Sequence, residues 1–583
     1  MMLSERTPVQ PQAFGVPRPR AGGDGKRGAE AAVGAGGQLS PEQLAIAMEV
    51  EAGRGNILVL ARAGTGKSYT IRACTPLMTG DVAICAFNKG ICDDMRAKMA
   101  AAGIRVPKWL GDHGRGEETS SRRGGRVVDV ATFHAFGLGA LRAAHPDLKL
   151  EGKGAKDAGY FKFDRIADEL KIPNHLRSFV RKALSLAKQR GFGVPGMVAA
   201  KDLDAWREMV HHFDLDAEVA DDGSVAMQIL VAKFGGDQDR AREEAVLAGL
   251  RHAYQALNLS RQWLHEVVDF DDMLWGPLVL GCRFPRRYDW VCTDEAQDSN
   301  PVRRRLALHM TKPGGRRMWV GDEFQAINGF SGADNDALDT ISREDCCAIL
   351  PLTVTYRCSK AVVRLAQALV PDYRAAAANP EGEVRHVTQA EFAQETLVPG
   401  EDAIICRNTK PLIECAYELI RRGVPSHVEG RDIGRGLLAL IDRWPSVRST
   451  SALMDKLDEH KERRVAKLLA AGREMQAGVL ADKVDTVLAI VRGLPKGSTV
   501  QDLRAQVEVL FSDTPDGQRR KSVTLLTAHK SKGLEFKRVY GWGNEKFIPS
   551  RFAKLAWQRQ QEMHLLYVLQ TRAIGTYVDV VVP

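Results

Sequence analysis

The chain has 583 residues, several times the length of an ordinary domain, so we expect about three to five structural units. Lys and Arg (82) outnumber Asp and Glu (73), which gives a formal charge of +9 and mildly favours a polyanionic partner. The ten cysteines form no C-x-x-C pair and no zinc-finger spacing, which argues against a structural metal site and fits reduced thiols in a cytosol. No apolar stretch of about 18 residues and no signal-peptide pattern occurs, so we expect an intracellular protein without a membrane span.

The first 37 residues are rich in Gly, Ala, Pro and Arg and have almost no large apolar side chains. Such a segment cannot bury enough surface to order itself, so residues 1–37 are predicted to form a flexible tail. The stretch 111–126 is polar, Gly-rich and basic. It is predicted to be a solvated loop, with phosphate contact as the minority alternative.

After the tail, short apolar runs alternate with helical stretches, which indicates a parallel α/β sheet. The runs are 56–60, 82–86, 127–131, 290–293 and 318–320. A long interval of helical periodicity separates the first three runs from the last two. We therefore predict one sheet domain interrupted by a helical insertion.

The same pattern returns in the second half of the chain, where strand-like runs at 403–406, 523–526 and 577–582 flank a helical, charge-rich interval. The predicted fold class is α/β, with two parallel-sheet domains that each carry a mainly helical insertion. The predicted first sheet domain covers 38–143 and 267–345 with its insertion at 144–266, and the second covers 346–432 and 521–583 with its insertion at 433–520.

The octamer ARAGTGKS, from Ala61 to Ser68, follows a predicted strand and precedes a predicted helix. In that context backbone N–H groups cradle phosphates, a lysine reaches the β- and γ-phosphates, and a hydroxyl holds Mg²⁺. Lys67 and Ser68 take those two parts, although Ala61 stands where the general pattern has glycine. The predicted phosphate-binding residues are Ala63, Gly64, Thr65, Gly66, Lys67 and Ser68.

The segment CTDEAQD, from Cys292 to Asp298, closes another apolar run. Asp294 is suited to binding Mg²⁺, and Glu295 to orienting or deprotonating an attacking water. An acidic cluster at a strand end can also be a solvated turn. Its combination with Lys67 favours a site that hydrolyses ATP with Mg²⁺.

Six ordered segments resemble the motifs of the UvrD/Rep-like superfamily 1 DNA helicases. They are ARAGTGKS, DEAQD, GDEFQAINGFSGAD at 321–334, TYRCS at 355–359, TAHKSKGLEF at 527–536 and LLYVLQTRA at 565–573. Four further segments agree, namely LSPEQ at 39–43, AFNKGICDDM at 86–95, VATFHAFG at 130–137 and DFDDML at 269–274. The resemblance spans residues 39–583, and AFNKGI is closer to the F-box-type and phage-type branches of the family.

The resemblance implies two RecA-like P-loop domains with ATP bound between them. Gln43 would hydrogen-bond the adenine, Tyr356 would stack on it, and Glu535 with Gly533 would reach the ribose. Structural roles compete with these assignments, since a glutamine before a helix is often only a surface residue.

Three further roles follow from the same resemblance. Gln325 would sense the γ-phosphate, while Arg357 and Arg572 would reach in from the second domain as arginine fingers. An arginine suits that part because it is always charged and planar, so it can stabilise the equatorial oxygens during phosphoryl transfer.

On the DNA side, the resemblance implies that Thr132, His134 and His529 contact the phosphate-sugar track and that Phe330 stacks on a base. Two positions depart from the family pattern. Ser331 stands where arginine is usual, and Asn328 stands where tyrosine is usual.

We therefore expect an ATP-dependent DNA helicase that moves 3′ to 5′ on single-stranded DNA and acts at junctions of single and double strands. We expect it in the cytoplasm at the nucleoid, as a monomer or weak oligomer, with replication or repair proteins as partners. The alternative is a single-strand translocase or nucleoprotein remodeller within a repair, replication or phage-defence complex. Only eleven residues (573–583) follow Arg572, which argues against a terminal nuclease domain, and the intact motif residues argue against a non-catalytic scaffold.

Overall fold

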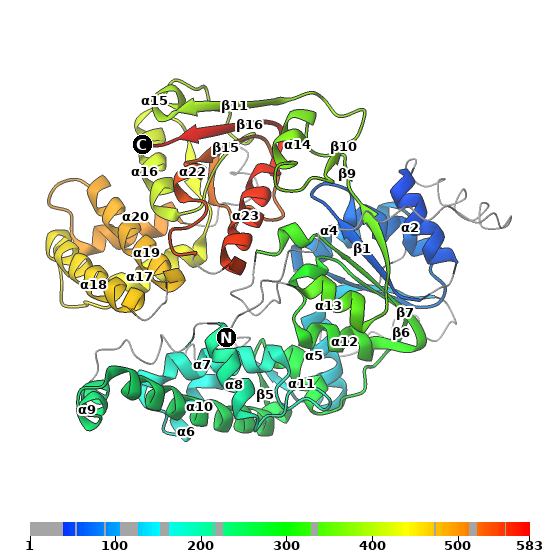
Figure 1. Cartoon of the computed structure of the whole chain (residues 1–583), viewed down its shortest axis with the longest axis horizontal. Coiled ribbons are helices and arrows are strands. Elements are labelled where there is room, and N and C mark those ends of the chain that lie inside the picture. Colours follow the sequence, from blue (N-terminus) through cyan, green and yellow to red (C-terminus); the bar gives the residue numbers. More distant parts are fainter. Residues whose placement is uncertain are drawn as a thin grey trace, which may run out of the picture.

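The computed structural model describes residues 39–52, 55–86, 89–104, 106, 126–151, 162–213, 215, 225–327, 336–470, 474–511, 522–553 and 556–583. Within these residues the chain forms two six-stranded sheets whose paired strands run parallel (Figure 1). Parallel strands need crossover connections, and helices supply most of them here. The predicted α/β class with two parallel-sheet domains is confirmed.

The first sheet has the strand order β3-β2-β6-β7-β1-β8. Its strands are β1 (Ile57–Ala61), β2 (Val82–Ala86), β3 (Val128–Thr132), β6 (Tyr288–Thr293), β7 (Thr311–Gly321) and β8 (Ala348–Leu352). Successive residues of β1 point to opposite faces, so Ile57 and Val59 enter one core and Leu58 the other. One face is covered by α2 (Pro41–Glu51), α3 (Lys67–Cys74) and α4 (Lys89–Ala101), and the other by α5 (Phe133–Ala144), α11 (Asp272–Val279), α12 (Pro301–Met310) and α13 (Ala337–Glu344).

The second sheet has the strand order β11-β16-β15-β12-β14-β13. Its strands are β11 (Glu383–Thr388), β12 (Asp402–Cys406), β13 (Ser426–Val428), β14 (Val523–Thr527), β15 (Phe536–Trp542) and β16 (Ala573–Val581). One face packs on α14 (Lys360–Ala366) and α23 (Ala556–Gln570), and the other on α15 (Gln389–Phe392) and α16 (Thr409–Arg421). The short helix α22 (Asn544–Phe547) follows β15.

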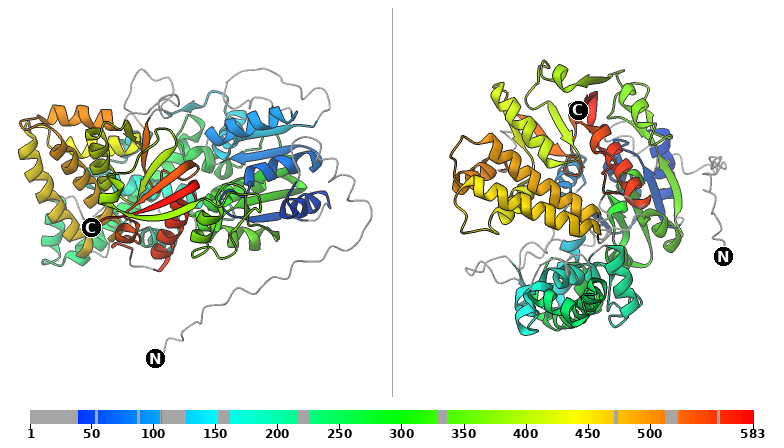
Figure 2. Two further views of the ribbon diagram at one scale, coloured as in Figure 1. Left: turned by 90° about the horizontal axis from the view of Figure 1, so that it is seen from above. Right: turned by 60° about the vertical axis from the view of Figure 1, so that its left-hand side comes forward.

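Each sheet domain carries a helical insertion, as predicted. The first contains α6 (Lys162–Glu169), α7 (Asn174–Arg190), α8 (Leu203–His212), α9 (Val225–Lys233) and α10 (Gln238–Gln262), and its ends meet in the small sheet of β4 (Lys149–Leu150) and β5 (Val267–Val268). The second contains α17 (Arg431–Ile441), α18 (Thr450–Ala470), α19 (Glu474–Gly493) and α20 (Val500–Leu510). Figures 1 and 2 show the two insertions as separate helical bodies. Each insertion nevertheless shares a hydrophobic core with its own sheet.

The boundary between the two sheet domains differs from the prediction. The sequence places the second domain from residue 346, but β8 pairs with β1 and completes the first sheet. Most residues of β8 are exposed, and Pro351 interrupts its apolar sequence. The segment therefore does not have the sequence pattern of a buried strand. After β8 the chain forms β9 (Val354–Thr355), which pairs with β10 (Arg374–Ala375) in a separate two-stranded sheet.

None of the helices in the described part of the chain is both long and apolar enough to cross a membrane.

Candidate nucleotide site and DNA-facing residues

The loop between β1 and α3 has the geometry of a phosphate cradle. Gly64 and Gly66 have φ values of 68° and 86°, in the left-handed region that glycine adopts without strain. Gly66 caps the N-terminus of α3, and Lys67 is its first residue. The free N–H groups and the dipole at this helix end both favour an anion.

The acidic residues after β6 meet the first turn of α3. Ser68 Oγ donates to Asp294 Oδ2 at 2.8 Å, and Lys67 Nζ lies 3.0 Å from Glu295 Oε2. Glu295 has a φ of 54°, a conformation that a non-glycine residue holds only when its surroundings impose it. The four side chains that the sequence assigned to phosphate and Mg²⁺ chemistry are therefore adjacent.

The carboxyl groups of Asp294 and Glu295 differ in pKa. Burial opposes ionisation of both. For Asp294, burial and the neighbouring Glu295 charge raise the pKa to about 6. For Glu295, the positive charges of Lys67 and Lys532 outweigh burial and lower the pKa to about 2. Glu295 is therefore a carboxylate at neutral pH, the form that can accept a proton from water.

The predicted γ-phosphate sensor is tied to the same acidic segment. Gln325 is buried and donates from Nε2 to Asp322 Oδ2 at 2.6 Å. Gln297 links the two segments, because its Nε2 donates to Glu295 and its Oε1 accepts from the Asp322 N–H at 3.0 Å. A displacement at Gln325 can thus be transmitted to Glu295 through Asp322 and Gln297.

The second domain closes on the phosphate loop. Tyr356 N–H donates to the Gly64 carbonyl at 3.0 Å, and the residue is 52% exposed. A methyl group added at Gly64 would come within 2.6 Å of Arg357 Cβ, so the two segments touch. Gln43 lies on the other side, where its Nε2 would be 3.2 Å from a Cβ at Gly66. Gln43 also completes the capping box of α2 through its contacts with Ser40.

The two predicted arginine fingers are placed differently. Arg357 faces the phosphate loop and pairs with Glu535 at 2.6 Å, whereas Arg572 is buried in the second domain. Arg572 donates to the carbonyl oxygens of Val568 at 2.9 Å and Leu534 at 3.1 Å. Burial and the Arg357 charge lower its pKa to about 10. Reaching a phosphate from this position would require Arg572 to exchange those carbonyls for phosphate oxygens.

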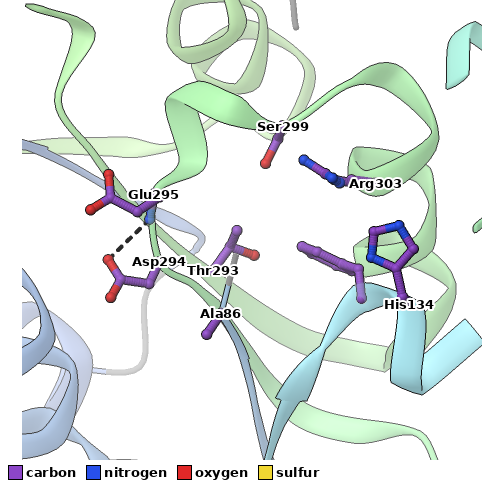
Figure 3. Close-up of a pocket in the computed structure, with 8 residues that line it drawn as sticks. Ala86, His134, Thr293, Asp294, Glu295, Ser299 and Arg303 are labelled. Atoms are coloured by element: carbon purple, nitrogen blue, oxygen red, sulfur yellow. Dashed lines mark hydrogen bonds between the residues drawn. The ribbon is translucent and has the colours of Figure 1, made fainter. Parts of the chain in front are cut away.

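The predicted DNA-facing residues lie at the ends of the strands. Thr132 caps α5 by accepting from the Ala135 N–H at 3.2 Å. His134 is only 8% exposed and stacks on Phe270, with ring centroids 3.8 Å apart. Burial, followed by the Arg303 charge, lowers the pKa of His134 to about 3. Both His134 and Arg303 line a small cavity that reaches Asp294 and Glu295 (Figure 3).

His529 follows β14 in the second domain, and burial, then the charges of Arg407 and Lys532, lower its pKa to about 3. Both predicted histidines are therefore neutral at physiological pH and can offer hydrogen bonds to a phosphate but no charge. Phe330, Asn328 and Ser331 lie outside the described residues. Gly533 has a φ of 86° and precedes Glu535 in the loop after β14.

Two residues stand out that the sequence had not singled out. Lys532 of the second domain reaches the first domain, where its Nζ lies 2.6 Å from Asp298 Oδ2 and 2.8 Å from the Gln325 carbonyl. Phe270 is 65% exposed above His134. Both lie inside quoted motifs, TAHKSKGLEF and DFDDML. The motifs were therefore the available signal, but only the contacts single out these positions.

The residues present fit a magnesium ion. Mg²⁺ prefers oxygen ligands and is usually held by one or two protein groups together with substrate phosphates. The Ser68 hydroxyl and the Asp294 carboxylate, 2.8 Å apart, form such an oxygen pair beside the phosphate loop. Among the described residues no cluster of three or more His, Cys, Asp or Glu side chains could cage a metal ion.

The fold and this site together define a P-loop nucleoside triphosphatase built from two parallel-sheet domains that meet at the phosphate loop. Residues 39–345 match the UvrD/REP helicase N-terminal domain, and residues 438–575 match the UvrD-like helicase C-terminal domain. The chain belongs to the UvrD/REP helicase family.

Similar curated proteins include the ATP-dependent DNA helicase UvrD2 of Mycobacterium tuberculosis and that of Mycobacterium bovis. Each is 25% identical over 588 aligned positions, which cover 90% of this chain and 76% of the relative.

Proposed function

We propose that the chain is an ATP-dependent DNA helicase that moves 3′ to 5′ along single-stranded DNA. The observation that carries the proposal is Lys532. It belongs to the second domain and contacts both the acidic segment and the sensor segment of the first domain. ATP chemistry at Glu295 and Gln325 is thereby connected to the relative position of the two domains. Membership of the UvrD/REP family and the UvrD2 relatives support a DNA substrate.

The hydrolytic step is assigned to the groups around the phosphate loop. Lys67 now pairs with Glu295, and the phosphates of ATP would draw the lysine toward them. Glu295 is then free to accept a proton from the attacking water. Mg²⁺, when held by Ser68 and Asp294, neutralises charge that develops on the phosphate oxygens. Arg357, which already touches the loop, supplies positive charge from the second domain.

DNA is proposed to lie across the two domains, along Thr132, His134 and His529. Phe270 is added to this track because it is an exposed aromatic ring stacked on a predicted contact residue. Exposed rings give stacking faces for successive bases irrespective of sequence. Phe330 keeps its proposed role as a base-stacking residue.

The proposed division of the chain follows from the sheets. The first α/β domain comprises residues 39–151 and 267–352, with the helical insertion between them, and the second comprises 353–430 and 522–583 around its own insertion. We propose a cytoplasmic protein that acts on DNA junctions together with replication or repair proteins.

Strand displacement on duplexes with matched 3′ or 5′ single-stranded tails tests the proposal. We expect ATP-dependent unwinding of the 3′-tailed duplex only. Unwinding of the 5′-tailed duplex alone would reverse the polarity. DNA-stimulated ATPase without unwinding of either duplex would favour a translocase that displaces bound proteins, and absence of DNA-stimulated ATPase would overturn the proposal.

A further inference from the structure

The residues that lead into the phosphate loop are held by side chains of the opposite domain. The Ala63 N–H donates to the Tyr567 hydroxyl at 2.9 Å, and the Tyr373 hydroxyl donates to the Ala63 carbonyl at 2.9 Å. Both tyrosines are fully buried in the core of the second domain, which also takes in Ala63. The second domain therefore holds the peptide groups on both sides of Ala63.

Arg62, the residue before Ala63, makes a second connection. Its Nε and Nη2 donate to the two carboxylate oxygens of Asp372 at 2.9 and 2.8 Å, a bidentate pair. Its guanidinium also lies over the Phe324 ring, 4.7 Å from the centroid. The Arg62 side chain is only 7% exposed, whereas that of Asp372 is 48% exposed, so the pair is shielded from solvent on its arginine side.

The same contacts include the sensor segment. Asp322 accepts from Gln325 at 2.6 Å and from the Tyr567 hydroxyl at 3.4 Å, and Arg62 lies 3.9 Å from its other oxygen. The start of the phosphate loop, the sensor and helix α23 are therefore bound to one another around Asp322. We call Arg62, Ala63, Asp372, Tyr373 and Tyr567 the clasp.

These bonds can exist only while the two domains are together, because their donors and acceptors belong to different sheets. Loss of the clasp leaves the start of the loop with one domain to hold it. The amides of Gly64 and Gly66 that would face the phosphates are one to three residues further on. The orientation of these amides is then less fixed before nucleotide binds. Ordering them during binding costs free energy, so the affinity for nucleotide decreases.

We propose that Asp372, Tyr373 and Tyr567 are positioning residues, which hold the phosphate loop in its nucleotide-binding geometry when the two domains are closed. The inference rests on the proposed nucleotide site. It adds that nucleotide affinity depends on the second domain through Arg62 and Ala63, and that opening of the domains weakens the hold on nucleotide.

The first test removes single hydroxyl groups. Tyr567→Phe and Tyr373→Phe in the full chain keep the ring and each lose one bond to Ala63, and Tyr567→Phe also loses the longer bond to Asp322. We expect the Kd for a fluorescent ADP analogue with Mg²⁺ to rise about two- to tenfold in each variant, the range of one hydrogen bond. KM for ATP should rise similarly with kcat nearly unchanged, since the interaction is made equally in ground and transition states.

Tyr540→Phe is the matched control. Tyr540 is also fully buried in the second domain, and its hydroxyl donates to Glu395 at 3.1 Å, within that domain. We expect this variant to lose thermal stability without a change in nucleotide Kd. An equal rise in Kd for Tyr540→Phe would mean general loosening of the domain and would overturn the inference.

The second test addresses the ion pair. Asp372→Asn should also raise the Kd, and Arg62→Lys combined with it should add little, because both changes remove one interaction. Glu381→Gln is the control, since it breaks the exposed pair with Arg364 inside the second domain. Additive effects of the Arg62 and Asp372 changes would count against the pair.

The outcomes separate this inference from the proposed function. Unchanged nucleotide Kd in Tyr567→Phe, Tyr373→Phe and Asp372→Asn would overturn the clasp, whatever the protein does to DNA. If these variants bind nucleotide more weakly but the wild-type protein does not unwind DNA, the clasp is supported and the helicase function is rejected. A wild-type protein that binds no nucleotide would reject both.

Discussion

The charge of Glu295 is compensated by neighbouring side chains of the first domain. Lys67 and Glu295 form an ion pair at 3.0 Å, and Gln297 Nε2 donates a hydrogen bond to the same carboxylate oxygen. A buried charge is tolerated only when it is paired. In the proposed mechanism the phosphates of ATP replace Glu295 as the partner of Lys67 before the carboxylate acts on water.

Glu295→Gln should separate binding from hydrolysis. The amide matches the carboxylate in shape but cannot accept the proton of water. We expect ATP to bind at least as tightly as in the wild type, because Lys67 loses a competing anion, while turnover falls by about 10² or more. Equilibrium binding and steady-state ATPase measure the two effects, and turnover near the wild-type rate would assign the base elsewhere.

His134 should make stability depend on pH. Its pKa is lowered to about 3 in the folded protein, whereas an unfolded histidine has a pKa near 6.5. Between these pH values the unfolded chain binds one proton more than the folded protein. The free energy of unfolding therefore decreases by about 1.4 kcal/mol for each unit that the pH is lowered below about 6.5. The stabilisation is present above pH 6.5 and is lost toward pH 3.

Urea unfolding of the wild type and His134→Asn at pH 7.5 and 5.5 checks this expectation. The variant lacks the titrating group, so the stability difference between the two proteins should shift by about 1.4 kcal/mol against the wild type at the lower pH. A difference that stays constant would show that His134 titrates normally in the folded protein.

At the scale of elements, short segments from both domains converge on the strand ends. The acidic segment after β6 and the sensor segment after β7 lie side by side because β6 and β7 are neighbours in the first sheet. The loop after β14 reaches them from the second sheet through Lys532. The order of the strands thus decides which motifs are in contact and can affect one another's position.

Lys532→Ala should uncouple hydrolysis from movement. The variant loses the link to Asp298 and to the Gln325 carbonyl but leaves the phosphate loop intact. We expect DNA to stimulate its ATPase less and fewer base pairs to be unwound for each ATP. Lys537→Ala, which removes an exposed pair with Glu401 in the same domain, is the control. Equal unwinding for each ATP in both variants would exclude this coupling role.

The insertion of the first domain is fixed by a buried ionic network. Lys188 and Asp272 are nearly solvent-free and lie 2.7 Å apart, and Asp269 and Lys162 complete the cluster. The three carboxylates of DFDDML, those of Asp269, Asp271 and Asp272, therefore contact side chains of the insertion, while Phe270 remains exposed. The network anchors the loop that presents Phe270 beside His134.

Lys188→Met should unfold the protein more easily and loosen this loop. Removing one partner of a buried pair typically costs about 3 to 5 kcal/mol because the other charge stays buried. Lys162 still faces Asp272 at 2.5 Å, so we expect the lower end, about 3 kcal/mol, in denaturant unfolding. A stability loss below about 1 kcal/mol, the value of an exposed pair, would contradict a structural role for the network.

At the scale of the whole molecule, a formal charge of +9 and a track across two domains predict salt-dependent binding to single strands. Neutralised phosphates release counterions, so log K should fall with log salt by about 0.7 for each phosphate contacted. Titrations at several salt concentrations with strands of unrelated sequence measure this slope. A flat response, or a strong sequence preference, would contradict backbone contact and base stacking as the main sources of affinity.

The sequence predicted the architecture well where local pattern and tertiary role agree. The runs at 82–86 and 403–406 are buried strands, because a strand covered on both faces is apolar throughout. The runs at 348–352, 383–388 and 536–542 escaped notice. β8 and β11 are edge strands with exposed residues, and in β15 the charged Lys537 and Arg538 follow the first residue.

What the sequence determined by itself is the set of residues proposed for the nucleotide site, whose side chains the structure brings together. Lys67, Ser68, Asp294 and Glu295 were predicted because such motifs are short and fix their own local geometry at a strand end. The tertiary structure decided which residues connect the domains. Arg62 and Asp372 are 310 positions apart, and Asp298 and Lys532 are 234 apart. An ordinary arginine, lysine or tyrosine carries no local signal of such a partner, because the contact exists only once two separately encoded sheets have folded and closed on one another.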